Sequence, residues 1–421
     1  MDFESLDLDP ELIAALTDNN LVQPTLIQQQ VLPTAMEGRD ILASAPTGTG
    51  KTLAFLLPAI QHLLDFPRRE LGPGRVLILT PTRELASQVF QQAKMLAAYT
   101  DHKVSMVTGG VDYALHAEVL KNNLDIVIAT PGRLLEYIRR DAFECAAIEV
   151  LILDEADRML DMGFYDDVKR ITDEMTRRQQ TMLFSATLEG RGIDRFAEEL
   201  LKEPAEFTAN PSRREKAKIH QFMHHVDNHT HKQALLVHWL RDESTTRSIV
   251  FVKTRERLAE LVSYLQSQDI PCAYLRGEMD QAKRTRSLNQ FKNDKVKVLI
   301  ATDVAARGID VQDVSHVFNF DLPRSAEIYV HRIGRTARAG KKGTAISLVE
   351  AHDLRIFGKI ERYTEEIIKR RVIQDLKPKN KIAVSKTKKK AKVAATGKNK
   401  ASAKAKLKAK KRTKKNKSKS K

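Results

Sequence analysis

The segment 40–64, DILASAPTGTGKTLAFLLPAIQHLL, predicts a short buried strand, a loop with two glycines and a long apolar helix in direct succession. Ten further apolar runs of strand length follow along the chain, mostly separated by stretches that favour helices. Such alternation is typical of a mostly parallel α/β fold, because parallel strands need a crossover, usually a helix. The further expected strands are RVLILTP, VSMVTGG, DIVIATP, VLILDEA, TMLFSAT, SIVFVKT, CAYLRG, VKVLIATD, HVFNFD and TAISLVE.

The loop in this segment has the composition of a phosphate-binding loop. Gly48 and Gly50 let the backbone turn its N–H groups toward phosphate oxygens, and the N-terminus of the following helix adds positive potential. Lys51 would reach the β- and γ-phosphates of a nucleotide, and the Thr52 hydroxyl would bind Mg²⁺. The general pattern GxxxxGK[ST] is missed only at its first position, Ala45. The residues expected to hold one nucleotide are Ser44, Ala45, Pro46, Thr47, Gly48, Thr49, Gly50, Lys51 and Thr52.

A second segment, VLILDEADRMLDMGF (150–164), ends a buried strand in several acids. An acidic first turn of a helix, favoured by the helix dipole, would explain Asp157 or Asp161. It explains the adjacent pair Asp154 and Glu155 poorly, because burying a carboxylate beside a hydrophobic core costs free energy unless a positive charge lies next to it. Asp154 is placed to bind the Mg²⁺ of the nucleotide, and Glu155 to orient and deprotonate the attacking water.

Two pairs of segments echo each other and suggest two related lobes, each with its own parallel sheet. ILTPTRELASQV resembles VFVKTRERLAELV, and IVIATPGR resembles VLIATDVAARG. The polar stretch EPAEFTANPSRREKAK separates the members of each pair. We expect lobe 1 at residues 1–205, a hinge at 206–218, lobe 2 at 219–365 and a disordered basic tail at 366–421.

The net charge of +17 is concentrated at one end of the chain. Residues 377–421 contain 21 Lys and Arg and no acid, whereas the rest holds 50 basic and 54 acidic side chains. A Lys-rich segment with few apolar residues cannot bury a core and is expected to be disordered. It would bind nucleic acid without sequence preference through counterion release, or it would only keep the protein soluble.

Composition also indicates in which cellular compartment the protein would be found. No stretch approaches the roughly 18 consecutive apolar residues of a membrane span, so we expect no membrane association. The acidic stretch MDFESLDLDP lacks the basic segment followed by an apolar segment that is typical of a signal peptide. Only Cys145 and Cys272 occur, without CxxC spacing, which disfavours a disulfide framework or a thiolate zinc site. A cytoplasmic location is expected.

Several short motifs occur in a fixed order: PTLIQ (24–28), APTGTGKT (45–52), PTRELA (81–86), GG (109–110), TPGR (130–133), DEAD (154–157), SAT (185–187), ATDVAARGID (301–310) and HRIGRTAR (331–338). In this order they resemble the DEAD-box ATP-dependent RNA helicases over about residues 3–350. The stretches LRGEMDQ and FNFDLPRS are most similar to the bacterial ribosome-assembly members of that family. The resemblance implies two tandem RecA-like lobes, ATP and Mg²⁺ as cofactors, and RNA as partner.

The resemblance also implies roles in ATP binding and turnover. Gln28 would read the edge of adenine, and Asp303 would meet the ribose. Arginine fingers supplied by lobe 2 would stabilise transition-state charge on the γ-phosphate only when the two lobes close. These fingers would be Arg335 and Arg338, and the residues coupling ATP to strand separation would be Asp157, Ser185, Thr187, His331 and Arg332.

RNA is expected to lie across both lobes. Small residues and backbone N–H groups at loop ends suit phosphate and sugar contacts, which position a strand without reading its sequence. The residues that match the family's RNA contacts are Pro81, Thr82, Arg83, Gly110, Thr130, Pro131, Arg133, Gly277, Thr302 and Gly308.

Two departures from the family pattern bear on these roles. Leu21 stands where an aromatic residue usually stacks on adenine, which would weaken base stacking. Ala337 replaces the more frequent glycine between the two fingers, a mild steric change at the finger loop.

Half of the histidines crowd the segment HQFMHHVDNHTHKQALLVH (220–238). A metal site is one interpretation. No Cys or ordered partner set accompanies them, and the segment favours a strand, a loop and a helix of lobe 2. We therefore expect these histidines to be structural.

The sequence thus predicts an RNA-stimulated ATPase that unwinds short RNA duplexes or remodels RNA–protein complexes. By analogy, the process would be assembly of the large ribosomal subunit, with ribosomal RNA, pre-ribosomal particles and ribosomal proteins as partners. One alternative is an RNA-annealing scaffold that acts through its tail, and another is a helicase that acts on DNA. Intact Lys51, Glu155, Arg335 and Arg338 argue against the scaffold.

Overall fold

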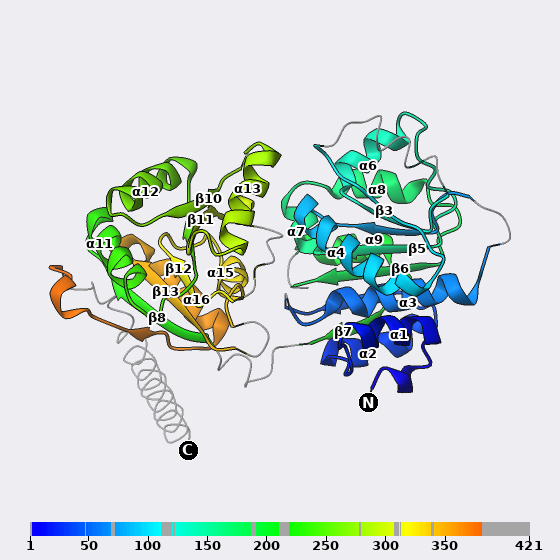
Figure 1. Cartoon of the computed structure of the whole chain (residues 1–421), viewed down its shortest axis with the longest axis horizontal. Helices are drawn as coiled ribbons and strands as arrows, with labels where there is room; N and C mark the ends of the chain where they lie inside the picture. Colours follow the sequence, from blue (N-terminus) through cyan, green and yellow to red (C-terminus); the bar gives the residue numbers. More distant parts are fainter. Residues whose placement is uncertain are drawn as a thin grey trace, which may run out of the picture. The chain divides into compact units, whose positions relative to one another are not determined.

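Seven parallel strands form the first of two sheets (Figure 1). In a computed structural model of the chain, residues up to Pro378 belong to one compact unit. In spatial order, the strands of the first sheet are β3 (Val104–Val107), β4 (Ile126–Ala129), β2 (Val76–Leu79), β5 (Val150–Asp154), β6 (Gln180–Ser185), β1 (Ile41–Ser44) and β7 (Ala205–Thr208). The structure describes residues 2–46, 48–68, 72–110, 120, 123–186, 191–209, 219–277, 279–306, 311, 313–337 and 341–380.

Helices cover both faces of this sheet. Its strands are apolar in succession because consecutive side chains point to opposite faces and both faces are buried. In β2, Val76 and Ile78 join one hydrophobic core, whereas Leu77 and Leu79 join the other. The helices are α1 (Pro10–Asp18), α2 (Leu26–Met36), α3 (Lys51–Asp65), α4 (Arg83–Leu96), α6 (Pro131–Ile138), α7 (Ala156–Asp161), α8 (Tyr165–Asp173) and α9 (Arg191–Leu200).

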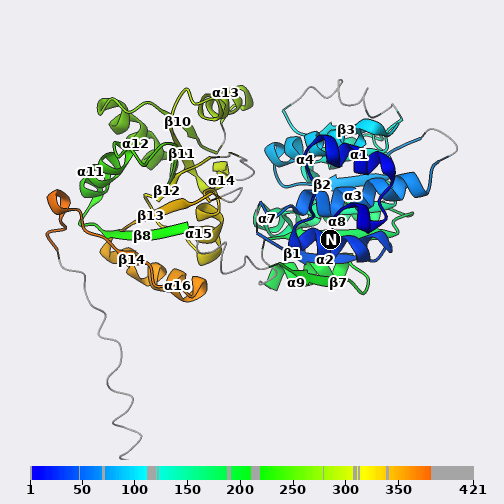
Figure 2. The same ribbon diagram turned by 60° about the horizontal axis from the view of Figure 1, so that its bottom comes forward.

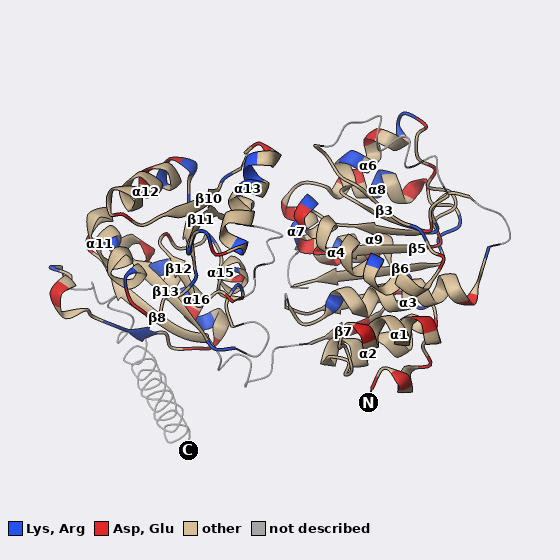
Figure 3. Ribbon diagram, viewed as in Figure 1, with Lys and Arg blue, Asp and Glu red and all other residues tan. Residues whose placement is uncertain are grey.

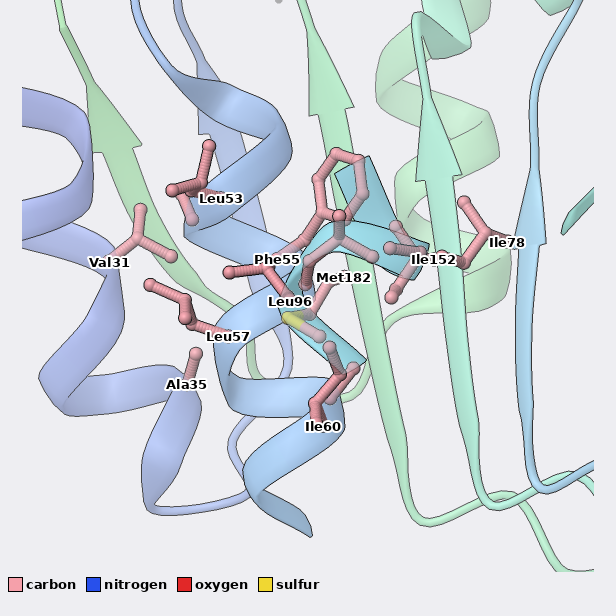
Figure 4. Packing of buried hydrophobic residues seen from close by; sticks show 14 of the residues in the cluster. Val31, Ala35, Leu53, Phe55, Leu57, Ile60, Ile78, Leu96, Ile152 and Met182 are labelled. Atoms are coloured by element: carbon pink, nitrogen blue, oxygen red, sulfur yellow. The ribbon is translucent and has the colours of Figure 1, made fainter. Parts of the chain in front are cut away.

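The apolar face of α3 anchors the phosphate loop to the first core. Figure 4 shows Phe55 and Ile60 of α3 among Ile78, Ile152 and Met182 of the strands, and all five side chains are fully buried. This packing fixes the N-terminus of α3 at the edge where β1 and β6 end.

The second sheet is also parallel and has seven strands. Its spatial order is β10 (Cys272–Leu275), β11 (Val298–Thr302), β9 (Ser248–Val252), β12 (His316–Asn319), β13 (Gly343–Val349), β8 (Ile219–His225) and β14 (Lys369–Arg370). The accompanying helices are α11 (His229–Leu240), α12 (Arg255–Ser267), α13 (Gln281–Lys292), α14 (Asp303–Ala306), α15 (Ala326–Ile333) and α16 (Leu354–Thr364). Short 3₁₀ turns occur at η1 (Glu4–Leu6), η2 (Ala97–Tyr99), η3 (Ala351–Asp353) and η4 (Gln374–Leu376).

The two sheets have the same topology. When the seven strands of each sheet are numbered in chain order, both sheets have the same spatial order, 3-4-2-5-6-1-7. β2 therefore corresponds to β9, and β4 to β11. These are the strands of the two echoing segment pairs. The expected α/β fold with two related parallel sheets is therefore confirmed, and all eleven expected strands are present.

The expected boundaries need two corrections. β7 pairs with β1, so the first sheet extends three residues into the stretch assigned to the hinge. β14 pairs with β8, and η4 follows it, although both fall in the stretch assigned to the tail (Figure 2). Residues 210–218 of the expected hinge and residues 381–421 of the expected tail lie outside the described residues.

Cys145 and Cys272 are both free. In the described part of the chain, no helix has the length and apolar character that a membrane span requires. Nor do the described residues include a group of three His, Cys, Asp or Glu side chains that could hold a metal ion.

Candidate active site

The phosphate loop connects β1 to α3 at the carboxyl end of the first sheet. The side chain of Lys51 is buried and folds back along the loop, where its Nζ donates hydrogen bonds to the carbonyl oxygens of Ala45 (2.7 Å) and Ser185 (3.5 Å). The Ala45 N–H donates to the same Ser185 carbonyl at 3.0 Å. The loop and the end of β6 are thus bound to each other, with an ammonium group held between them.

Gln28 joins the start of α2 to this loop. Its Oε1 accepts a hydrogen bond from the Thr25 N–H (2.7 Å), and its Nε2 donates to the Gly50 carbonyl (2.9 Å). Gly50 has φ +93°, and a Cβ there would lie 2.6 Å from Gln28 Nε2. Any other residue here would be strained by the positive φ and would push the Gln28 amide out of its hydrogen bond, so glycine suits this position. Within the loop, the Thr49 hydroxyl donates to the Pro46 carbonyl at 2.8 Å.

Asp154 ends β5 beside β6, in register with Phe184. It is almost fully buried, and burial raises its pKa to about 7, although the nearby Lys51 opposes this shift. Its Oδ1 is buried without a hydrogen-bond partner. A buried carboxylate oxygen with no donor is suited to a cation, so Asp154 fits the expected Mg²⁺ site at the mouth of the loop.

Glu155 has the opposite electrostatic environment. Burial opposes ionisation, but the cations of Arg158, Lys51 and Arg335 outweigh it and hold the pKa of Glu155 below its ordinary range. Arg158 makes a direct ion pair with its Oε2. Glu155 also has φ +56°, a conformation that is uncommon outside glycine and frequent at functional sites. Neighbouring carboxylates with pKa values pushed apart are typical of sites where one binds charge and the other accepts a proton.

Residues of the second half contribute to this environment. Arg335, almost fully buried, lowers the pKa of Glu155 by its charge. His331 has a buried Nε2 without a hydrogen-bond partner. Burial lowers the pKa of His331 to about 4, although Asp157 opposes the shift. His331 is therefore neutral near pH 7, and it lies close enough to Asp157 of the first half for that carboxylate to act on its pKa.

Arg332 is bound differently from its neighbour His331. Its guanidinium donates to both carboxylate oxygens of Asp303 (2.6 and 2.9 Å) and to Asn319 Oδ1 (3.0 Å). It also lies over the ring of Phe251, 4.9 Å from the centroid. These partners all belong to the second half of the chain. In this conformation Arg332 therefore orders the Asp303 carboxylate within the second half of the chain.

Of the expected RNA contacts in the first half, all but Gly110 lie at the starts of helices. The Arg83 guanidinium lies directly against Gly109 and Gly110, so closely that a Cβ at either glycine would collide with it. Thr82 caps α4 by accepting a hydrogen bond from the Leu85 N–H at 3.3 Å. Pro81 precedes this cap, Thr130 and Pro131 begin α6, and Arg133 lies over the Tyr137 ring. In the second half, Thr302 ends β11 and Gly277 follows β10.

Four expected site residues, Thr47, Thr187, Gly308 and Arg338, lie outside the described residues. Other residues of the site were missed from sequence. Arg158 follows Glu155 at helical i, i+3 spacing, which is a signal that sequence could have supplied. The ion pair between Glu84 and Arg284 joins positions 200 residues apart and has no local signal.

Comparison with known proteins agrees with this arrangement. Residues 25–196 match the family model for DEAD/DEAH box helicases, and residues 231–340 match the helicase conserved C-terminal domain. The chain is 58% identical over 384 residues to the ATP-dependent RNA helicase SrmB of Escherichia coli, covering 91% of this chain and 86% of that protein. It belongs to the DEAD-box helicase family. This helicase is therefore an RNA-stimulated ATPase, and ATP is its nucleotide substrate.

Two further comparisons place the helicase within the family. SrmB of Haemophilus influenzae is 56% identical over 379 residues, covering 90% of this chain and 86% of that one. The structure of Saccharomyces cerevisiae Dbp5 bound to RNA and ADP BeF3 superposes with a TM-score of 0.77 at 30% identity, covering 88% of this helicase and 95% of Dbp5. The expected family, its likeness to SrmB and the tandem RecA-like fold are confirmed.

Proposed function

We propose that this helicase separates short RNA duplexes locally by closing its two lobes on ATP and one RNA strand. The observation that carries the proposal is contact between the lobes: Glu84 of α4 forms an ion pair with Arg284 of α13, and the charge of Arg335 lowers the pKa of Glu155 across the same boundary. A site completed by both lobes hydrolyses ATP only when they meet, and this couples hydrolysis to a change in the RNA site.

In this proposal, lobe 1 (the front lobe) binds the nucleotide and activates the attacking water. Lys51 and the loop N–H groups hold the β- and γ-phosphates and Gln28 contacts the base, while Asp303 of lobe 2 would meet the ribose. Thr52 and Asp154 would hold Mg²⁺, which neutralises phosphate charge when bound. Glu155 is ionised at neutral pH and accepts the proton of the attacking water, while Arg158 keeps its carboxylate in place.

Lobe 2 (the rear lobe) supplies the positive charge that stabilises the transition state. Arg335 and Arg338 would act as arginine fingers on the γ-phosphate, a contribution of roughly 10³–10⁵ in rate for such residues. Asp157, Ser185, Thr187 and His331 would transmit the state of the nucleotide to the RNA contacts. We assign those contacts to the backbone-rich set around Arg83, Gly110 and Arg133 on the front lobe and to Gly277, Thr302 and Gly308 on the rear lobe.

The biological process we propose is assembly of the large ribosomal subunit in the cytoplasm, with ribosomal RNA, pre-ribosomal particles and ribosomal proteins as partners. Its support is the similarity to SrmB along most of the chain. The basic segment 377–421 would add a non-specific, salt-dependent attraction to RNA.

The test compares ATP hydrolysis with matched RNA and DNA single strands, and unwinding of a short RNA duplex with one three times as long. We expect stimulation by RNA alone, because only RNA offers 2′-hydroxyls, and unwinding of the short duplex alone. Equal stimulation by DNA would favour the DNA helicase, and strand annealing without ATP dependence would favour the scaffold.

A further inference from the structure

A pocket of about 310 Å³ opens on the second sheet at the edge away from the nucleotide site. His220, Thr344 and His316 are directly paired in register across β8, β13 and β12, at the amino ends of these strands. Asp303, the expected ribose partner, instead follows β11 at the carboxyl edge of the sheet, and Asn319, which binds Arg332, ends β12 there. Because all strands are parallel, the pocket and the ATP site lie at opposite edges of the sheet.

Aromatic rings form the wall of this pocket. Trp239 of α11 is half-buried, and its ring centroid lies 6.1 Å from that of His316. The indole Nε1–H donates to His224 Nε2 at 3.0 Å, which fixes the orientation of the ring. Burial lowers the pKa of His224 to about 4, so that its ring nitrogen is free to accept this bond near neutral pH. Trp239 therefore offers a rigid, partly exposed aromatic face.

A cation stands at the rim of the pocket. The exposed guanidinium of Arg371 lies over the ring of Phe222, 3.7 Å from its centroid, and both side chains line the pocket. Lys369 and Arg370 of β14 are exposed immediately before it, and basic residues mark this strand in Figure 3. The residues that line the pocket include no carboxylate. The rim is thus positive, and the Lys-rich segment begins only six residues further on.

We infer that this pocket binds one unpaired nucleobase of RNA, stacked on Trp239, while Arg371 contacts an adjacent phosphate. The inference rests on RNA being the partner of this helicase, as proposed above. Aromatic faces that stack bases and cations that hold the backbone are the two features of single-strand binding. Ser244 and His220 at the pocket wall supply hydrogen-bonding groups for a base edge. An acidic peptide suits the pocket less well, because Arg371 is the single Lys or Arg among its lining residues.

The chain offers a specific reporter, because Trp239 is its only tryptophan. The full-length protein is titrated with single-stranded oligouridylate RNA, and with an abasic strand of the same length and charge. We expect RNA to quench the Trp239 emission and the abasic strand to leave most of it, since only a base can stack on the indole. Arg371→Ala should weaken the RNA affinity measured by quenching several-fold.

Arg370→Ala is the matched control, because it removes the same charge from the neighbouring exposed position, which does not line the pocket. It should retain the quenching. Equal quenching by the abasic strand, equal loss in Arg370→Ala and Arg371→Ala, or Arg371-dependent quenching by polyglutamate would each overturn the inference. RNA-stimulated ATP hydrolysis is measured in the same samples. Normal RNA stimulation of ATP hydrolysis without quenching of Trp239 overturns only the inference about the pocket. Absence of RNA stimulation contradicts the proposed function.

Discussion

Glu84 and Arg284 form an ion pair that joins α4 of the front half to α13 of the rear half. Both side chains are largely buried, and Arg284 also donates a hydrogen bond of 2.7 Å to the Ala305 carbonyl. Glu84 follows the residues Pro81, Thr82 and Arg83, which we assign to RNA. The pair therefore joins the segment that we assign to RNA to the lobe that carries the proposed arginine fingers.

Glu84→Gln should make closure on RNA less favourable. A hydrogen bond between charged groups contributes roughly 1.5–3 kcal/mol, so we expect roughly a tenfold rise in the RNA concentration that gives half-maximal ATP hydrolysis. The exchanged pair, Glu84→Arg with Arg284→Glu, should recover part of this loss. An unchanged half-maximal RNA concentration in Glu84→Gln would show that the pair does not support closure.

Glu155→Gln should leave ATP and RNA binding intact and abolish turnover. The amide keeps the size of the side chain but cannot accept the proton of water, and a positioned general base contributes roughly 10²–10⁴ in rate. Binding is measured with a fluorescent ATP analogue, and turnover by phosphate release with saturating RNA. Undiminished RNA-stimulated hydrolysis would refute the role of Glu155 as base.

Ala337→Gly should stabilise the second lobe. Ala337 has φ +57°, a left-handed conformation that costs a residue with a Cβ about 1 kcal/mol relative to glycine. We expect a small rise in the thermal midpoint of the unfolding transition that Trp239 emission reports. Ala345→Gly, in the buried interior of β13, is the control and should lower it. A lower midpoint in Ala337→Gly would mean that the conformation is not strained.

Acid should destabilise the second lobe through His224. Burial lowers the pKa of this imidazole to about 4 in the folded protein, against about 6.5 in the unfolded chain. The unfolded state then binds more protons between these values, so stability falls as pH drops from 6.5 toward 4, by roughly 2 kcal/mol at pH 5. His224→Gln keeps an acceptor for Trp239 and should flatten the dependence measured by urea unfolding. If the slope in this pH range persists unchanged, His224 is not its source.

The predictability of this fold from sequence follows the burial of its strands. β2, β4, β5, β6, β9 and β11 are buried on both faces and therefore appear as continuous apolar runs. β7 and β14 are edge strands, and neither has such a run. In β7 exposed and half-buried residues alternate, and β14 consists of the exposed pair Lys369 and Arg370. Their pairing depends on the neighbouring strands rather than on their own sequence.

The candidate site divides in the same way. Lys51 and the pair Asp154 and Glu155 follow directly from local patterns, because the loop and the strand end carry their own chemistry. The contact of Arg332 with Asp303 and the pairing of Glu84 with Arg284 depend on how distant segments fold together. No periodicity or spacing predicts such contacts, since the tertiary structure alone creates them.

In the proposed mechanism, one nucleotide is bound by acids of the front lobe and a guanidinium of the rear lobe at the same time. The most direct measurement is the single-turnover rate of ATP hydrolysis by Arg335→Ala at saturating ATP and RNA. We predict normal binding of both ligands and a rate lower by roughly 10³-fold or more. A rate within a few-fold of the unmodified protein would contradict the account, because hydrolysis would then proceed without the rear lobe.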